Sequence, residues 1–248
     1  MHRSTTGPLH RAGHRPANRL ALIVLIGLLA GCGLPPPPEV QRLVDAPAGR
    51  PDQISFAEIA RRVEPVAHAL CRARGIVRTC TFRFLIDTRP DQPPNAFQTV
   101  DRLGRPILGF NAALIAQARN ADELAFVMGH EAAHHIQGHI PQREQAAMSG
   151  AILGTELATA QGLPQAEIER AGLIGAELGA RRFSKAFELE ADAVGTEIAL
   201  AAGFDAVRGA AFFDRLPDPG NRFLGSHPAN AERKALVRAT QARLLAGQ

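Results

Sequence analysis

The chain lacks acidic residues at its start, and it lacks net charge over the rest of its length. Four arginines, at positions 3, 11, 15 and 19, precede position 20, and the first acidic residue is Glu39. The 248 residues include 28 basic and 24 acidic side chains, so without those four arginines 24 of each sign remain. A formally neutral body does not complement the phosphates of a nucleic acid. Nucleic-acid binding is therefore excluded as a function.

A long membrane-spanning run is also missing from the N-terminal region. The apolar run at 20–30 is too short to cross a bilayer comfortably, and it follows a basic segment, as in a secretory signal. Its end, "LAGC" at 29–32, resembles the bacterial lipobox, so residues 1–31 are predicted to be a lipoprotein signal peptide and Cys32 to be lipidated. An uncleaved membrane anchor is the alternative. Gly33 instead of Asp after the cysteine favours the outer membrane, with the protein facing the periplasm and held by two or three acyl chains.

The segment after this signal contains four consecutive prolines at 35–38. Such a run favours the extended polyproline II conformation, which acts as a semi-rigid spacer. We therefore assign residues 32–53 to a lipidated cysteine and a proline-rich tether, and residues 54–248 to one folded domain.

Cysteine is scarce, with three residues in the whole chain. Lipidation of Cys32 leaves Cys71 and Cys80, which are nine positions apart. In an oxidising periplasm these two could form a disulfide that closes a small loop. Two buried free thiols are the alternative, because spacing alone does not show whether two cysteines can be bridged.

Hydrophobic periodicity and capping signals predict an α+β domain that is mostly helical. Ser55 with Glu58, and Asn120 with Glu123, have the spacing of helix N-caps. Alternating apolar residues predict a small antiparallel sheet. The predicted strands are 80–87, 96–100 and 106–110, and the predicted helices are 55–73, a helix from Asn120 that stops at Gly138 and Pro141, 142–160, 164–181, 184–203, 206–216 and 228–246.

The stretch "VMGHEAAHHIQGH" at 127–139 carries four of the nine histidines. His130 and His134 are four residues apart, so both imidazoles lie on one helix face and can bind one metal ion. Glu131 can contact water at that metal without being a ligand. This HExxH arrangement is typical of zinc peptidases, in which zinc lowers the pKa of its water to about 7 and the glutamate is the general base.

A catalytic zinc needs a third protein ligand. Glu188 and Asp192 are also four residues apart on a predicted helix, so one carboxylate could bind the metal and the other could accept the free N–H of a ligating histidine. Glu190 competes with Glu188 for the ligand position. A di-iron bundle would also use Glu131-x-x-His134, but it requires a second such motif, which the sequence does not contain.

Together these motifs resemble the HtpX/BepA-like family of zinc metallopeptidases, in the gluzincin group. The resemblance covers roughly residues 55 to 240. It implies a zincin-type fold in which His130, His134 and Glu188 bind one zinc ion per chain, Glu131 is the base and Asp192 orients a ligand. Three segments carry it beyond the two ligand motifs: "PNAF" at 94–97, "ADELAFVMGHEAAHHIQGH" at 121–139 and "SHPANAER" at 226–233.

The absence of tyrosine removes one usual stabiliser of the oxyanion in zinc peptidases. The candidates that remain for that role are His227, an arginine such as Arg233, or zinc alone. Alternatively, His227 could occupy the open zinc position and keep the enzyme latent. His135 and His139 are predicted to lie off the ligand face, as structural or solvated side chains.

The resemblance implies an endopeptidase that cleaves unfolded or misassembled cell-envelope proteins. A substrate would add as a strand at Asn95, Ala96 and Phe97. The following "QTVDRLGRP" departs from the glycine-rich turn that is usual in the family. The competing hypothesis is a non-catalytic, zinc-binding envelope chaperone or scaffold, although a structural zinc site would not need Glu131. The sequence carries no signal of an oligomeric state.

Overall fold

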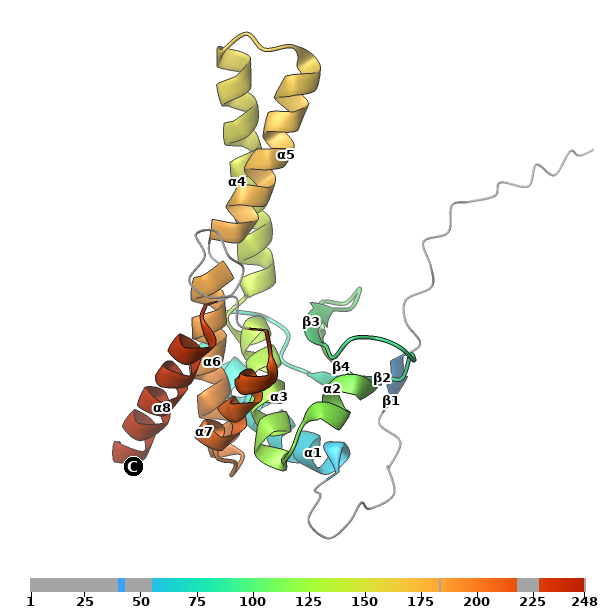
Figure 1. Cartoon of the computed structure of the whole chain (residues 1–248), viewed down its shortest axis with the longest axis vertical. Coiled ribbons are helices and arrows are strands. Elements are labelled where there is room, and N and C mark those ends of the chain that lie inside the picture. The colour runs from blue at the N-terminus through green and yellow to red at the C-terminus, as the bar shows by residue number, and fades with distance from the viewer. Residues whose placement is uncertain (1–39, 43–54, 183, 218–227, 248) are drawn as a thin grey trace, which may run out of the picture. The chain divides into compact units, whose positions relative to one another are not determined.

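A computed structural model describes residues 40–42, 55–182, 184–217 and 228–247 of the protein (Figure 1). The chain divides into the units Met1–Pro36 and Pro37–Gln248, and all of the described residues belong to the second. The strands are β1 (Val40–Arg42), β2 (Arg83–Asp87), β3 (Ala96–Val100) and β4 (Pro106–Asn111). The helices are α1 (Phe56–Arg74), α2 (Ala112–Gln117), α3 (Ala121–Ile136), α4 (His139–Ala160), α5 (Gln165–Arg182), α6 (Ser184–Ala201), α7 (Ala206–Gly209), the 3-10 helix η1 (Ala210–Arg215) and α8 (Asn230–Ala246).

The predicted helix starts and stops are set by the expected side chains. Ser55 accepts a hydrogen bond from the Glu58 backbone N–H at the start of α1, and Asn120 does the same for Glu123 at the start of α3. α3 ends before Gly138, whose φ of 67° takes the chain out of the helical spiral. α4 then begins at His139, three residues earlier than predicted, because Pro141 fits the first helical turn, where no N–H is needed.

The α+β fold class is confirmed, but the sheet is mixed and not purely antiparallel. Its strand order is β1-β2-β4-β3. β3 and β4 form the expected antiparallel hairpin, in which Ala96 lies opposite Phe110, while β2 runs parallel to β4. The reason is the segment 88–95, which carries the chain past the position of β4, so that β3 forms at the far side and β4 returns between β2 and β3.

Three further elements were not predicted in this form. β1, in the segment assigned to the tether, pairs antiparallel with β2 and thereby satisfies backbone groups at the edge of that strand. Asn111 caps the short helix α2 by accepting from the Leu114 N–H. The segment predicted as one helix at 206–216 is α7 followed by the tighter η1.

The core lies where α1, α3 and α6 pack together over the sheet. The crossing of α3 and α6 is a backbone contact, since a Cβ on Gly129 would lie 2.8 Å from the Gly195 carbonyl oxygen. A Cβ on Gly195 would in turn lie 2.8 Å from the His130 nitrogen. Glycine on both helices therefore permits their close approach. The largest fully buried apolar side chains are Phe110, Phe126, Ile59, Leu108, Met128, Ile136, Ile198, Val63 and Val237.

A disulfide between Cys71 and Cys80 joins the last turn of α1 to the segment before β2. The two Cα atoms are 5.7 Å apart, which is within the usual range for a bridged pair, and both side chains are buried. The bridge closes a loop of nine residues' separation. It therefore restricts the unfolded chain near the start of the sheet.

Replacing both cysteines, as Cys71→Ala with Cys80→Ala, should lower the free energy of unfolding by about 2–3 kcal/mol, because the unfolded chain regains the entropy of this loop. Denaturant unfolding of the wild type with and without dithiothreitol measures the same loss. The double variant is the control and should not respond to the reductant. A wild-type transition that is unchanged by full reduction would contradict this expectation.

Candidate metal centre

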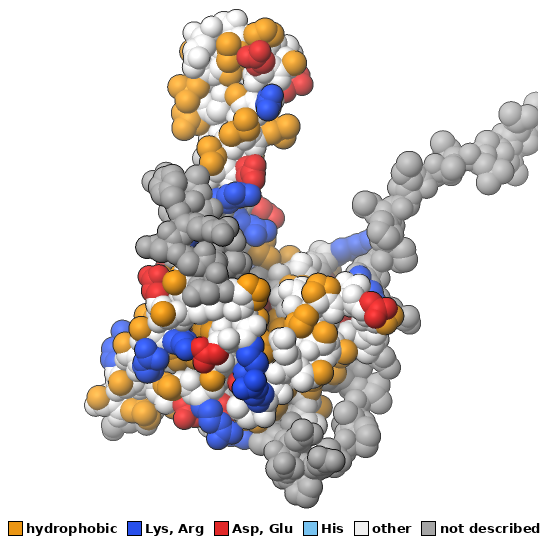
Figure 2. Space-filling model, viewed as in Figure 1, with side chains coloured by type: hydrophobic (Ala, Val, Ile, Leu, Met, Phe, Trp, Pro, Cys, Tyr) orange, Lys and Arg blue, Asp and Glu red, His pale blue; other side chains and the backbone are white. Residues whose placement is uncertain are grey.

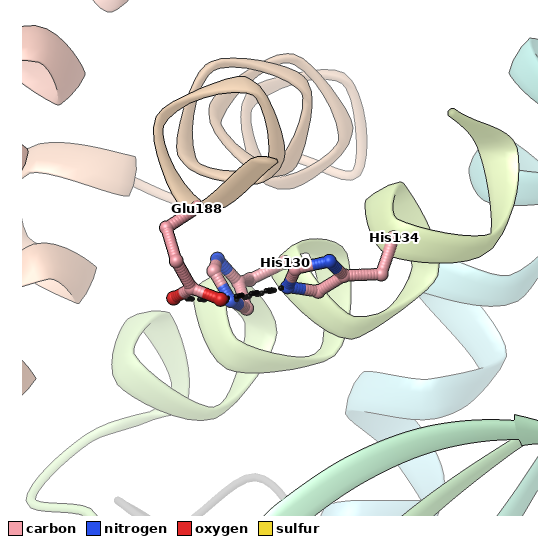
Figure 3. A group of neighbouring side chains, drawn as sticks. All are labelled: His130, His134 and Glu188. Carbon is pink, nitrogen blue, oxygen red and sulfur yellow. Dashed lines mark hydrogen bonds and ion pairs between the residues drawn. The ribbon is translucent and has the colours of Figure 1, made fainter. Parts of the chain in front are cut away.

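Three potential metal ligands converge from α3 and α6 (Figure 3). His130 and His134 extend from successive turns of α3, and their Nε2 atoms are 3.1 Å apart. Glu188 reaches over from α6, with its carboxylate oxygens 3.7 Å from His130 Nε2 and 3.4 Å from His134 Nε2. The three donor atoms lie within 4.8 Å of one another.

This donor set fits a zinc ion. Ligand atoms 2.0–2.1 Å from one ion at tetrahedral angles lie about 3.3 Å from each other. The two imidazole nitrogens, 3.1 Å apart, are close to that value, and each Glu188 oxygen lies within 3.7 Å of one of them. Two imidazole nitrogens and one carboxylate oxygen also match the ligand chemistry of catalytic zinc sites with one open position. The geometry supports Glu188 as the third ligand, because Glu190 contacts His139 instead.

Asp192 holds the first histidine. Its Oδ1 lies 2.9 Å from His130 Nδ1, so Nδ1–H donates to the carboxylate and Nε2 is free to bind a metal. Asp192 is fully buried. Arg233 from α8 donates from Nε and Nη2 to the two carboxylate oxygens at 2.7 Å each, and its guanidinium lies 4.0 Å from the centre of the Phe213 ring.

Arg233 therefore belongs to the support of the metal centre. Two of its nitrogens are engaged by Asp192, and Nη2 is also 3.4 Å from Glu188 Oε2. This arrangement supports a positioning role for Arg233, in contrast to the oxyanion role considered from the sequence. The sequence showed a basic residue after the "HPAN" segment but gave no indication that it pairs with Asp192.

His139 is a structural side chain, as predicted, but its contact with a candidate ligand was not predicted. Its side chain is buried, its Nδ1 lies 2.8 Å from His134 Nδ1, and its Nε2 lies 3.2 Å from Glu190 Oε2. The left-handed turn at Gly138 takes it off the α3 helical spiral and returns it to the ligand. His139 is therefore in direct contact with the second histidine of the motif.

The tautomers of this chain of contacts follow from the metal-binding role of His134. If Nε2 of His134 binds the metal, its Nδ1 carries the proton and donates to Nδ1 of His139. Nε2–H of His139 then donates to Glu190. The pKa of His139 is lowered to about 4, mainly by burial and secondly by repulsion from His134. The ring therefore stays neutral, and Nδ1 remains an acceptor. A stacked Phe187 ring, with centroids 4.3 Å apart, fixes its orientation.

The candidate ligands open into a cleft of about 480 Å³. Glu131 lines it, and burial raises the pKa of this carboxyl, although the neighbouring His130 and His134 oppose the shift. Asn95 and Ala96 of the expected substrate strand also line the cleft. Phe97 does not, because its side chain points to the other face of the sheet and covers Gly109 on β4.

The other candidate residues fall into two groups. His135 has the predicted structural role: its Nε2–H donates to the Thr79 carbonyl oxygen at 2.6 Å, and its ring meets the edge of Phe82. Cys32 and His227 lie outside the described residues. No helix within the described ranges is long and apolar enough to cross a membrane.

Comparison with known families agrees with the geometry. Residues 54–241 match peptidase family M48. The chain belongs to peptidase family M48. The predicted resemblance is therefore confirmed. This M48 chain is a metalloprotease, since its family is metal-dependent and its side chains on α3 and α6 form a group that could hold a metal ion.

One curated relative of this M48 chain is a Vibrio cholerae serotype O1 protein named as a beta-barrel assembly-enhancing protease. The two are 31% identical over 163 residues. The aligned region is 63% of this chain and 32% of the relative, so the chain spans about a third of that protein's length.

Replacing His139 by Phe should weaken zinc binding about 10- to 100-fold, because Phe keeps the stacking on Phe187 but cannot accept from His134. His139→Asn should lose much less zinc affinity, since its amide oxygen can accept a hydrogen bond from His134 near the same position. Competition with a chromophoric chelator measures the affinity.

His135→Asn is the matched control, because it alters an equally buried histidine of α3 that contacts Thr79 and not the candidate ligands. It should lower thermal stability and leave zinc affinity unchanged. A His139→Phe protein that binds zinc as tightly as the wild type would refute the role assigned to His139.

Proposed function

We propose that this M48 peptidase is a zinc-dependent endopeptidase that hydrolyses peptide bonds in unfolded or misassembled cell-envelope proteins. The observation that carries the proposal is the meeting of His130, His134 and Glu188 beside Glu131 in one cleft, next to the edge strand β3. A purely structural zinc site has no use for a carboxylate that is beside the metal and open to a cleft.

Zinc held by these three residues would act as a Lewis acid that lowers the pKa of water to about 7 and polarises the scissile carbonyl. The Glu131 carboxylate accepts the proton of the attacking water and then delivers it to the leaving amide nitrogen. Burial raises the pKa of the Glu131 carboxyl and so favours the protonated form that follows the first step. Asp192 and His139 keep the Nδ1 protons of the two histidines in place.

The polypeptide substrate is proposed to lie along β3. Among the described strands, β3 pairs with β4 alone, so its outer backbone edge can accept an added strand. Asn95 and Ala96 place that edge at the cleft, opposite the motif helix. A backbone-paired substrate fits an enzyme that accepts many sequences, because the main-chain hydrogen bonds do not depend on the side chains.

The envelope location and substrates are proposed from two independent features. The named activity of the Vibrio relative concerns beta-barrel assembly, although the aligned region is only part of that protein. The "LAGC" sequence at 29–32 resembles a lipobox, followed by Gly33 and not Asp. Lipidated Cys32 would hold the domain at the outer membrane, facing the periplasm.

Glu131→Gln should bind zinc normally and lose at least about 100-fold in kcat, because the amide cannot accept the proton of water. Hydrolysis of a denatured protein and zinc content, measured on the same preparation, test this. Activity near that of the wild type would refute Glu131 as the base. Failure of the zinc-loaded wild type to cut any denatured protein would instead favour the non-catalytic chaperone or scaffold.

Cys32→Ser should release the protein from the membrane fraction into the soluble periplasmic fraction, because no acyl chain can then be attached. Fractionation measures the release from the membrane, and metabolic labelling with palmitate measures the loss of the acyl chain. Cys71→Ser is the control cysteine variant, and it should keep the lipid label. A Cys32→Ser protein that stays in the membrane would indicate an uncleaved anchor.

A further inference from the structure

The hairpin formed by α4 and α5 is packed backbone to backbone. A Cβ added to Gly150 would lie 2.1 Å from the Gly175 carbonyl oxygen, and one added to Gly179 would lie 2.1 Å from the Ala146 carbonyl oxygen. The small residues therefore bring the two helices so close that no large side chain fits between them. α5 packs mainly against α4, with little contact to other helices or strands.

This packing leaves the large apolar side chains of the hairpin outside the contact. Four of them have 46% to 57% of their residue surface open to solvent: Leu153, Leu157, Ile174 and Leu178. They line a groove of about 850 Å³ along the hairpin, and none of the described residues that line it is charged. Figure 2 shows the orange apolar side chains gathered along the two helices. A large contiguous apolar surface that is open to solvent marks a binding site for a protein, a membrane or a ligand.

The groove borders the cleft of the metal centre. Phe187 on α6 lines both of them. On α4, Ile140 and Arg143 line the cleft, while Gln142 and Gln145 line the beginning of the groove. A chain that leaves the cleft past Phe187 would therefore meet the groove next.

We propose that the α4–α5 groove binds an apolar stretch of the same polypeptide that is cleaved in the cleft. The inference rests on the proposed function and makes it more specific: the substrate is a chain with an exposed apolar segment at a distance from the scissile bond. Unfolded proteins expose such segments and folded ones bury them. The groove would therefore favour unfolded substrates, whereas strand addition at β3 accepts almost any sequence.

The chemistry of the hairpin favours this occupant over a lipid surface. Glu156, Glu167 and Glu169 are exposed near the hairpin turn, with only Arg170 beside them. An anionic membrane surface attracts basic clusters and not acidic ones. A second copy of the chain is the other occupant to test, because two apolar hairpins could also cover each other.

The hairpin offers neighbouring apolar residues for a matched comparison. Leu153→Ser with Ile174→Ser removes apolar surface from the groove. Ile152→Ser with Leu173→Ser changes the adjacent residues, which are 52% and 74% exposed and do not line the groove. Both pairs make the same kind of change on the same helices, so a loss of helix stability would affect them alike.

The zinc-loaded full-length chain in lipid vesicles should be assayed on a denatured protein and on a short peptide that fills only the cleft. The groove variant should raise KM for the denatured protein at least about ten-fold, with the value for the short peptide unchanged. The control variant should match the wild type on both substrates.

An unchanged KM in the groove variant would overturn the proposal. So would an equal rise in KM for both substrates, or an equal rise in KM in the control variant. A groove variant that changes only from dimer to monomer by light scattering would identify a second copy as the occupant. Cys32→Ser protein should also be tested for flotation with phosphatidylglycerol vesicles. Flotation that disappears when the groove changes Leu153→Ser and Ile174→Ser are added would identify a lipid surface as the occupant.

A binding measurement separates this inference from the proposed function. Glu131→Gln protein should bind a labelled denatured protein by fluorescence anisotropy, and the added Leu153→Ser and Ile174→Ser changes should weaken that binding at least about ten-fold. If this holds while the wild type cleaves nothing, the proposed hydrolysis fails and the groove assignment stands. If the wild type cleaves but the groove changes leave binding intact, the groove assignment fails alone.

Discussion

The close crossing of α3 and α6 is the contact on which the metal centre depends. Gly129 and Gly195 allow the two backbones to touch, and His130 immediately follows Gly129. Glu188 lies seven residues before Gly195, which is about two helical turns. The crossing therefore fixes the position from which the Glu188 carboxylate reaches the two imidazoles. Larger residues at the crossing would separate the helices, and the ligands would move apart with them.

The buried charges beside this crossing tie a third helix to the centre. A carboxylate as buried as Asp192 is stable only when it is paired and hydrogen-bonded. Arg233 from α8 and His130 from α3 supply that pairing. The same contacts that orient the ligand therefore also compensate a buried charge, so the catalytic and structural roles of these residues cannot be separated completely.

The sequence predicts those features of this protein that depend on local chemistry. The caps at Ser55 and Asn120 and the common face of His130 and His134 follow from spacing alone, and the family resemblance selected Glu188 over Glu190. The parallel pairing of β2 with β4 was not predictable, because it depends on where the segment 88–95 carries the chain. The pairing of Arg233 with Asp192 depends on how α8 packs, and no short-range pattern contains that information.

His139 connects the chemistry of the site to the α4–α5 hairpin. The spacing along the sequence did not indicate its contact with His134, because the contact depends on the turn at Gly138, after which His139 starts the next helix. The first residue of α4 therefore supports His134, and later turns of the same helix line the apolar groove. Because α4 is one continuous helix, a polypeptide held in the groove is positioned relative to the metal ligands by a rigid element. This is why we assign recognition and cleavage to a single substrate chain instead of to two independent surfaces.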